Sequence, residues 1–242
     1  MIIHAALRPG SGTQPAPIVI AVDTLRASTT ITVALESGAE CVLPVTTVED
    51  GRRLKASRPA ALLCGEERAL PPEGFDYGNS PLEFSKLDLS GKVIILATSN
   101  GTPLLQRYAD ADLLLVGCLR NAAAVAASAA NVKRDVLVAC AGAAASGEPA
   151  FEDTFTAGAI INELIRDQEG FELGDEAREA FDLFLAHGGD AAQAFRESDH
   201  ASYLVSIGFG DDVAFCAEPN VSTAVPIALS DDGEFRVELL KS

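Results

Sequence analysis

The sequence is short of basic side chains. Its 242 residues include 18 Lys and Arg against 35 Asp and Glu, which gives a formal net charge of −17 at pH 7. It contains no cluster of basic residues of the kind that neutralises the phosphates of a polyanion. We therefore expect neither nucleic acids nor anionic membrane surfaces as partners. The acidic excess is uneven. Residues 148–200 hold 14 acidic and three basic side chains, whereas residues 1–60 hold five acidic and six basic side chains.

Long hydrophobic runs, paired cysteines and histidines are also scarce. No apolar run reaches the roughly 18–20 residues of a membrane-spanning helix, and no apolar signal-peptide core follows Met1. The five cysteines include no Cys-x-x-Cys pair, and only three histidines are present, which argues against a zinc site or a thioredoxin-type motif. We expect a cytoplasmic protein whose cysteines are small buried apolar side chains.

Several motifs of phosphate chemistry are missing as well. The sequence has no Gly-x4-Gly-Lys-Ser/Thr loop, and no Gly-x-Gly-x-x-Gly follows the run 18–22, which disfavours nucleotide-driven kinases and dehydrogenases. It has no Cys-x5-Arg loop, so a phosphocysteine mechanism is not expected. Two residues after Asp23 stands Leu25 rather than a second aspartate, so the paired-aspartate loop of haloacid-dehalogenase-type phosphatases is absent too.

The chain does contain an alternation of short apolar runs and helical segments. The apolar runs predict strands at Ile18–Val22, Cys41–Val45, Ala61–Cys64, Val93–Ala97, Leu113–Val116, Val136–Cys140, Val213–Ala217, Ala224–Ala228 and Phe235–Leu239. Helical patterns cover Ser28–Ser37, Val48–Ser57, Pro103–Ala109, Ala122–Ala130, Asp153–Asp167, Glu176–Ala186, Asp190–Arg196 and Ser202–Gly208. This order predicts an α/β fold, with a mainly parallel sheet flanked by helices in three α/β/α layers. We expect one unit over residues 1–242, or two lobes of about 1–147 and 148–242.

Polar residues follow most of the predicted strands. The segments concerned are Asp23–Thr30, Gly65–Arg68, Thr98–Thr102, Gly117–Asn121 and Ala141–Gly142. Because the carboxyl ends of parallel strands meet at one edge of a sheet, we expect the binding site there. Asp23 and Glu66 are hard oxygen ligands suited to Mg²⁺, and Arg26 offers a fork of donors that fits phosphate, sulfonate or carboxylate. The residues thus indicate a site for a small oxyanion and a divalent cation.

Each of these candidates also has a structural interpretation. Ser28 and Thr29 lie near the start of a helix, where they either help to bind an anion or cap the helix. Asn100 and Gly101 either direct backbone N–H groups at a ligand or form an ordinary turn. Arg26 either binds the substrate or joins a surface ion pair.

Two further segments have two interpretations each. The loop 74–81 either folds over a ligand or forms an ordinary turn. Glu152 and Asp153 open the predicted helix 153–167, where they are metal ligands or an acid–base pair, or they interact with the helix dipole.

Five blocks of the sequence resemble a known family. The runs AVDTLRASTTI (21–31), GFDYGNSPLE (74–83), ATSNGT (97–102), EDTFTAGAII (152–161) and GFGDDVAFCAEPNVSTAVP (208–226) are similar to blocks of the 2-phosphosulfolactate phosphatases, the ComB family. The resemblance implies an α/β enzyme that uses Mg²⁺ to hydrolyse 2-phospho-3-sulfolactate to 3-sulfolactate and phosphate. In methanogens that reaction belongs to coenzyme M biosynthesis.

The resemblance and the strand-end argument together give a set of expected site residues. The expected catalytic residues are Asp23, Glu66, Glu152 and Asp153, and the expected Mg²⁺ ligands are Asp23, Glu66 and Asp153. The expected substrate-binding residues are Arg26, Ser28, Thr29, Asn79, Ser80, Thr98, Asn100, Gly101, Thr102 and Asn121. Asp23 is either a nucleophile or a metal ligand, and the lack of a second aspartate near it favours a ligand.

One segment departs from the family pattern. The family usually reads Gly-Glu-Arg-Gly where this chain has Gly65-Glu66-Glu67-Arg68, so Glu67 stands at the position of an arginine. Two alternative functions therefore stay open: a Mg²⁺-dependent phosphatase of another small phosphorylated hydroxy acid, and a non-catalytic anion-binding module. The apolar stripe of the predicted helix 153–167 fits either the core or the interface of a homodimer.

Overall fold

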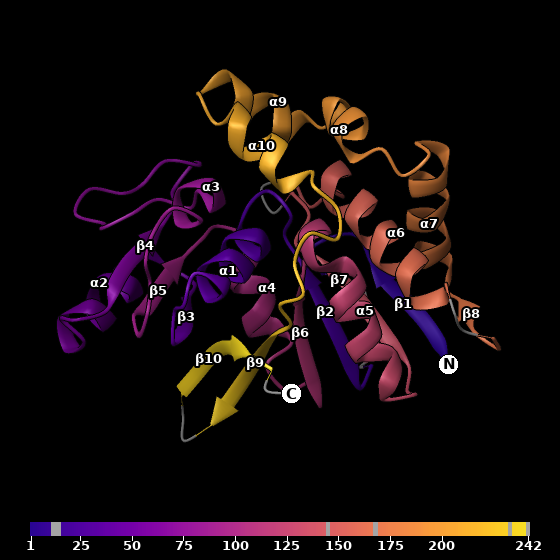
Figure 1. Cartoon of the computed structure of the whole chain (residues 1–242), viewed down its shortest axis with the longest axis horizontal. Helices are drawn as coiled ribbons and strands as arrows, with labels where there is room; N and C mark the ends of the chain where they lie inside the picture. The colour runs from indigo at the N-terminus through magenta and orange to yellow at the C-terminus, as the bar shows by residue number, and fades with distance from the viewer. Residues whose placement is uncertain (11–15, 144–145, 167–168, 232–233, 241–242) are drawn as a thin grey trace.

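A ten-stranded sheet runs through the part of the chain that the computed structural model describes, which comprises residues 1–10, 16–143, 146–166, 169–231 and 234–240 (Figure 1). Its order is β4-β5-β3-β10-β9-β6-β2-β7-β1-β8. The strands are β1 (Ile2–Ala6), β2 (Ile18–Val22), β3 (Cys41–Val45), β4 (Leu62–Gly65), β5 (Val93–Ala97), β6 (Leu113–Gly117), β7 (Val136–Cys140), β8 (Glu172–Leu173), β9 (Pro226–Asp231) and β10 (Glu234–Leu239). Most neighbours pair in parallel, which confirms the predicted α/β class.

The sheet consists of two parallel groups joined by an antiparallel hairpin. We call β6-β2-β7-β1-β8 the central group and β4-β5-β3 the lateral group. β9 and β10 form the hairpin. β9 pairs antiparallel with β6 through two residue pairs, and β10 pairs antiparallel with β3 through one residue pair. In a flat sheet, three successive antiparallel pairings would direct the carboxyl ends of the two groups to opposite edges. The cavity described below is lined from the carboxyl ends of both groups, so the sheet bends at the hairpin.

Helices cover both faces of the central group. The helices of the described residues are α1 (Ala27–Glu36), α2 (Val48–Ser57), α3 (Pro81–Phe84), α4 (Gly101–Arg107), α5 (Ala122–Asn131), α6 (Phe151–Ile165), α7 (Asp175–Ala186), α8 (Ala191–Ala194), α9 (Asp199–Ser206) and α10 (Gly210–Cys216), and those that cover the central group are named below with the strand residues they contact. Alternate side chains of β2 point to opposite faces. Val19 and Ala21 pack in one hydrophobic cluster with α1 and α4, whereas Ile18, Ile20 and Val22 pack in another with α5, α6 and α7. This packing is consistent with three layers.

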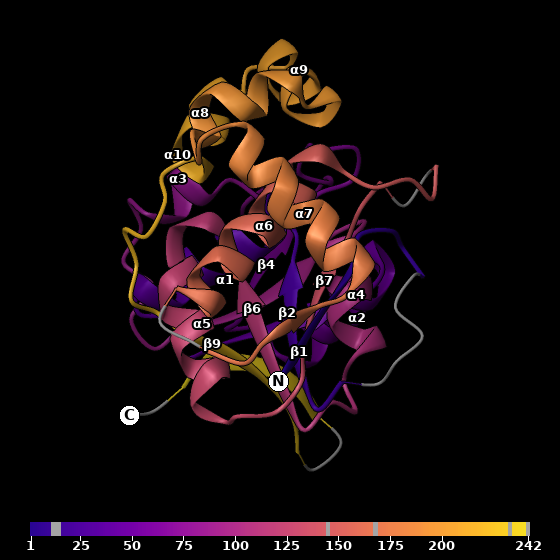
Figure 2. The ribbon, with the colours of Figure 1, turned by 90° about the vertical axis from the view of Figure 1, so that its right-hand side faces the viewer.

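A set of helices lies over the carboxyl edge of the central strands. We call α8, α9 and α10 the cover, and both ribbon views show it above the sheet (Figures 1 and 2). A separate hydrophobic cluster joins the cover to α6, in which Phe195, Leu204 and Cys216 pack together with Phe155. The cover therefore closes one side of the edge where the strands end.

Most predicted elements are confirmed to within three residues, but some differ. The strand predicted at Val213–Ala217 is wrong, because this segment forms α10, in which Asp212 and Cys216 are buried one turn apart. β1 was not predicted, and the strands predicted near the carboxyl terminus form the antiparallel hairpin. The predicted helix 153–167 begins earlier, at Phe151, and Asp167 lies outside the described residues. The sheet takes strands from both sides of residue 147, and the division into two lobes there stays a prediction.

The five cysteines are free and buried, as expected. Cys41 lies in β3, Cys64 in β4, Cys118 after β6, Cys140 in β7 and Cys216 in α10. Burial raises the pKa of each thiol above its usual value, to about 12 for Cys64. Among the described residues, no helix is both long and apolar enough to cross a bilayer.

Candidate active site

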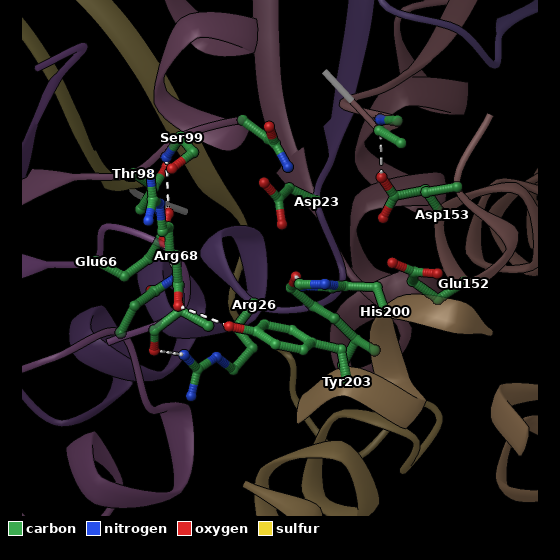
Figure 3. A pocket seen from close by; sticks show the side chains of 17 residues that line it. Asp23, Arg26, Glu66, Arg68, Thr98, Ser99, Glu152, Asp153, His200 and Tyr203 are labelled. Carbon is green, nitrogen blue, oxygen red and sulfur yellow. Dashed lines mark hydrogen bonds between the residues drawn. The ribbon is translucent and has the colours of Figure 1, made fainter. Parts of the chain in front are cut away.

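A cavity of about 300 Å³ opens at the carboxyl ends of the strands. It is lined by the loops after β2, β4, β5 and β7, by the start of α6 and by α9 of the cover. Figure 3 shows Asp23 in the middle of the lining, with Glu152 and Asp153 on one side and Glu66 and Arg68 on the other. The loops after these four strands thus converge; parallel pairing brings together the ends within each group, and the bend at the hairpin brings the two groups together.

Asp23 follows β2 directly and is buried, with 8% of its surface exposed. Its Oδ1 accepts a hydrogen bond from the backbone N–H of Ala27, at 3.2 Å. Burial raises the pKa of the Asp23 carboxyl to about 6, and repulsion from Glu66 and Glu152 adds to that rise. The bond from Ala27 and the nearby His200 act in the opposite direction. Asp23 is therefore a carboxylate that gains from a positive charge placed beside it.

Asp153 and Glu152 come from the first turn of α6. Asp153 is buried, and its two carboxylate oxygens accept hydrogen bonds from the backbone N–H groups of Thr24 at 2.8 Å and Gly142 at 3.1 Å. It thereby connects the loops after β2 and β7. Burial, followed by repulsion from Asp23 and Glu152, raises the pKa of Asp153 well above its usual value. Glu152 is also buried, and its Oε2 accepts from the hydroxyl of Ser198 at 2.7 Å.

Glu66 lies on the opposite side of the cavity and holds backbone. Its Oε1 accepts from the N–H of Ser99 at 2.8 Å, and its Oε2 accepts from the N–H of Ala69 at 2.7 Å. The carboxylate therefore bridges the loop after β4 and the loop after β5. Each oxygen has lone-pair capacity left, so the expected role of Glu66 as a metal ligand stays a prediction.

The acidic side of the cavity has a donor set that fits Mg²⁺. Within the described ranges, no group of three or more His, Cys, Asp or Glu side chains is arranged to hold a metal ion. Mg²⁺ usually takes only one or two carboxylates and keeps several waters, so a cage of three protein ligands is not required. Asp23, Glu152 and Asp153 are hard oxygen donors that repel one another in a buried site, and a divalent cation relieves such repulsion.

Arg26 lines the cavity, but its guanidinium is engaged by the protein. Nη1 donates to Asp212 Oδ2 at 2.7 Å, Nη2 donates to the carbonyl of Ala69 at 2.8 Å, and the guanidinium carbon lies 4.2 Å from the centroid of the Phe209 ring. The ion pair is buried, with 2% and 3% of the two side chains exposed, rather than on the surface. Arg26 is thus held by its partners in the cover and in the turn after β4.

Three of the expected substrate-binding polar residues also line the cavity, namely Asn79, Thr98 and Asn100. Asn79 is buried, and its Oδ1 has no hydrogen-bond partner within the part of the chain that the structure describes. A buried amide oxygen without a partner is costly unless a ligand or a water supplies a donor. Asn79 is therefore prepared to accept a hydrogen bond from a molecule in the cavity.

Comparison with known proteins identifies the family. A family model described as 2-phosphosulpholactate phosphatase matches residues 4–231. The chain belongs to this family. Three relatives carry the name probable 2-phosphosulfolactate phosphatase. The protein from Thermotoga petrophila is 39% identical over 86% of this chain and 87% of its own. The protein from Carboxydothermus hydrogenoformans is 37% identical over 91% of this chain and 90% of its own. The protein from Clostridium perfringens strain 13 is 34% identical over 84% of this chain and 83% of its own.

Several residues in the phosphatase family's blocks lie outside this cavity lining and bind the backbone. Ser28 Oγ donates to the carbonyl of Asp23 at 2.7 Å, and Thr29 Oγ1 donates to that of Thr24 at 2.9 Å. Thr102 Oγ1 donates to the carbonyl of Thr98 at 2.9 Å. These contacts shape the loops around Asp23 and Thr98, and direct binding of substrate by the three hydroxyls stays a prediction.

Gly101, Ser80 and Asn121 also have local structural contacts. A Cβ on Gly101 would lie 2.7 Å from Asp23 Oδ2, so a residue without a side chain is needed there. Ser80 caps α3 and donates to Asp212 at 2.7 Å. Asn121 is buried; its Nδ2 donates to the carbonyls of Val116 and Ala224, and its Oδ1 accepts from the N–H of Cys118. The loop after β6 thus contributes structure rather than cavity lining.

The lining residues of this phosphatase family member that were not among the expected site residues include Arg68, His200 and Tyr203. His200 and Tyr203 belong to α9, and their rings stack with centroids 6.3 Å apart (Figure 3). His200 Nε2 lies 3.0 Å from the carbonyl oxygen of Leu25. No motif marks these positions in the sequence, because they reach the cavity only through the packing of the cover on α6.

Proposed function

We propose that the chain hydrolyses 2-phospho-3-sulfolactate to 3-sulfolactate and phosphate with Mg²⁺ as its cofactor. Family membership and the names of the relatives support the substrate. The observation that carries the chemistry is that Asp23, Glu152 and Asp153, from distant parts of the sequence, converge on one cavity at the carboxyl ends of the strands. The pKa values of Asp23 and Asp153 are both raised, mainly by burial, and buried carboxylates with a raised pKa in a cavity are characteristic of catalytic sites.

The acidic side of the cavity is assigned to the cation. Asp23 and Asp153 would hold Mg²⁺, and the backbone bonds from Thr24 and Gly142 keep the Asp153 carboxylate in one orientation. When bound, Mg²⁺ neutralises charge on the phosphate and polarises phosphorus. With a cation beside it, Asp23 is ionised at neutral pH despite its raised pKa.

Glu152 is the preferred group to accept a proton from the attacking water. Both oxygens of Asp153 and of Glu66 accept backbone N–H groups, whereas Glu152 Oε1 has no such partner among the described residues. In this scheme the water oxygen bonds to phosphorus while the bond from phosphorus to the C2 oxygen of the substrate breaks. The water proton passes to Glu152, and the released C2 oxygen takes up a proton from solvent. Asp23 then acts as a ligand and not as a nucleophile.

The experiment that tests the function is phosphate release from 2-phospho-3-sulfolactate with and without EDTA. We expect activity that EDTA abolishes and added Mg²⁺ restores. Mg²⁺ alone should also raise the melting temperature of the wild type and leave that of Asp23→Asn unchanged, since binding to the native state stabilises it. Full activity in EDTA, with no effect of Mg²⁺ on melting, would remove the metal from the proposal.

The role of Asp23 is tested by the Asp23→Asn variant. We expect turnover to fall by roughly 10²-fold or more, a typical effect for a group that acts on the reacting atoms. Asp110→Asn, an exposed change far from the cavity lining, is the matched control and should retain wild-type turnover. Borohydride trapping during turnover separates the two mechanisms, because it reduces an aspartyl phosphate at residue 23 to homoserine, whereas direct attack of water forms no acyl phosphate that could be reduced.

A second substrate class is favoured by one observation. Glu67 is exposed and does not line the cavity, whereas Arg68, one residue further on, does. The cation of this turn is therefore displaced relative to the usual family pattern, which favours a related phosphorylated hydroxy acid as an alternative substrate. A panel of phosphorylated two- and three-carbon acids distinguishes the two by kcat/KM.

A further inference from the structure

Arg68 sits in an unusual backbone turn at the cavity. The turn spans residues 66–70 after β4, and both Arg68 and Ala69 have positive φ angles, 53° and 66°. The left-handed conformation is sterically unfavourable for residues with a Cβ, and two such residues in succession are uncommon. Strained backbone of this kind persists only where surrounding structure enforces it, and it is concentrated at functional sites.

The surrounding structure does enforce this turn. Glu67 and Leu70 exchange backbone hydrogen bonds at 2.9 and 3.2 Å. The Glu66 carboxylate holds the N–H of Ala69, and Arg26 Nη2 holds the carbonyl of Ala69 at 2.8 Å. The hydroxyl of Tyr203 donates to the carbonyl of Arg68 at 3.2 Å. The turn is therefore fixed by its own bonds, by the start of α1 and by the cover.

The fixed turn presents an arginine, Arg68, that has no anionic partner among the residues the structure describes. Arg68 is exposed at the cavity, and its guanidinium makes no hydrogen bond or ion pair with any residue in the described ranges. The other lining arginine, Arg26, is buried and paired with Asp212. Arg68 is thus the lining guanidinium whose donors are available to a ligand.

The position of Arg68 relative to the acids gives it a specific use. Four carboxylates line the cavity, and Figure 3 shows Glu152 and Asp153 across Asp23 from Arg68. A substrate with several anionic groups is repelled by the acidic side unless its non-reacting anions lie elsewhere. A guanidinium fork matches the oxygens of a sulfonate or a carboxylate and forms charge-assisted hydrogen bonds with them.

We propose that Arg68 binds the non-reacting oxyanion of the substrate, a sulfonate or a carboxylate, and so selects phosphate esters that carry a second anionic group. This inference rests on the proposed function only in assuming that the chain hydrolyses phosphate esters. The Glu66 bridge and the Tyr203 hydroxyl act as positioning groups, because they hold the backbone from which Arg68 extends.

The test compares four phosphate esters on wild type, Arg68→Ala, Arg68→Lys and the control Arg196→Ala. Arg196 is exposed, lies outside the cavity lining and has no ion-pair partner in the part of the chain described. Arg196→Ala therefore removes one positive charge, as Arg68→Ala does, but away from the cavity. The esters are 2-phospho-3-sulfolactate, 2-phospholactate, which lacks the sulfonate, 2-phosphooxyethanesulfonate, which lacks the carboxylate, and phenyl phosphate, which lacks both.

We expect Arg68→Ala to lower kcat/KM for 2-phospho-3-sulfolactate by about 10- to 100-fold, mainly through KM, because a charge-assisted contact to a bound anion is lost. Arg68→Lys should recover part of this loss, and phenyl phosphate should change by less than about threefold. Whichever single-anion ester becomes insensitive to Arg68→Ala lacks the group that Arg68 binds. Calorimetric binding of 3-sulfolactate, which involves no turnover, should weaken in parallel.

Two results would overturn the inference. One is equal loss on all four esters, which would place Arg68 in the chemistry or in the stability of the site rather than in selection. The other is a wild type that does not prefer esters with a second anion over phenyl phosphate. A wild type that hydrolyses 2-phospholactate but not 2-phospho-3-sulfolactate, and loses its preference for that ester in Arg68→Ala, would refute the proposed substrate and support Arg68.

Discussion

The central and lateral groups of the sheet both supply carboxylates to the cavity, but they use them differently. Asp23 and Glu152, next to the central strands, each keep a carboxylate oxygen without a hydrogen-bond partner among the described residues, and burial leaves them short of positive charge. Glu66, in the lateral group, has both oxygens bound to backbone N–H groups of two loops. The lateral carboxylate therefore holds backbone, whereas on the central side only Asp153 does so, and Asp23 and Glu152 keep the free oxygens that the proposed chemistry requires.

This division gives the cavity two unlike sides. The side next to the central group concentrates negative charge and suits a cation together with the reacting phosphate. The side next to the lateral group presents Arg68 and the polar residues Thr98 and Ser99 on a rigid framework. A small molecule with several anionic groups can then place its reacting and non-reacting ends on different sides.

The most severe way to disrupt the two sides is to remove Asp212, because it connects them. Its carboxylate accepts from Arg26 after β2, from Ser80 at 2.7 Å and from the N–H of Leu82 at 3.3 Å. Asp212→Ala leaves the Arg26 guanidinium buried and unpaired, so we expect a loss of about 3–5 kcal/mol in the free energy of unfolding. Denaturant titration measures it.

The neighbouring Asp211 provides the control for that change, since it lies in the same first turn of α10 but is exposed. Asp211→Ala should change the free energy of unfolding by less than about 1 kcal/mol. If Asp212→Ala were equally mild, the ion pair with Arg26 would not connect the cover to the sheet.

The different roles of Glu66 and Glu152 are tested by replacing each glutamate with glutamine. Glu66→Gln retains one acceptor oxygen and loses one of the two backbone hydrogen bonds, so the free energy of unfolding should fall by about 1–2 kcal/mol. Glu152→Gln keeps its packing and should leave stability within about 1 kcal/mol. It should also reduce kcat by roughly 10²-fold, because an amide cannot accept the proton from water. Paired denaturation and kinetic measurements on both variants test this; a larger kcat loss in Glu66→Gln would reverse the assignment.

The smallest expected effect is a pH dependence of stability that comes from Asp23. Its pKa is raised in the native state from 3.8 to about 6, so folding favours its protonated form. Its contribution is therefore fully present below about pH 4 and is lost as the pH rises through about 6. In EDTA, Asp23→Asn should match the wild type near pH 4 and exceed it by about 1–3 kcal/mol above pH 7. A stability difference between the two proteins that does not vary with pH would show that the Asp23 carboxyl is not destabilised by burial.

The sequence predicts the strand-end geometry well because that geometry depends on local patterns. Continuous apolar runs such as 18–22 and 136–140, rich in β-branched residues, favour strands buried on both faces, and the residues that follow parallel strands share an edge. Asp23 and Glu66 were found in this way. Ser28 and Thr29 show the limit of the argument, because adjacency to a strand end does not determine whether a hydroxyl faces the cavity or its own backbone.

The cover was harder to predict, for two physical reasons. The run Val213–Ala217 is apolar enough for a strand, and only the burial of Asp212 and Cys216 on one side shows that it forms a helix. His200 and Tyr203 reach the cavity through long-range packing of α9, which no local pattern records. The position of Arg68 at the cavity was equally hard to predict, because the backbone conformation of its turn depends on distant partners at the start of α1, after β5 and in α9.

The five buried thiols allow the order in which parts of the molecule open to be measured. A thiol reacts with an alkylating reagent only as an exposed thiolate, and burial with a raised pKa suppresses both conditions in the native state. Cys216 belongs to the cover, Cys41 and Cys64 to the lateral strands, and Cys140 to the central strands. Pulsed alkylation followed by mass spectrometry would time each labelling event separately. Early labelling at Cys216 alone would mean that the cover detaches while the sheet remains intact, so that access to the active site is a local opening.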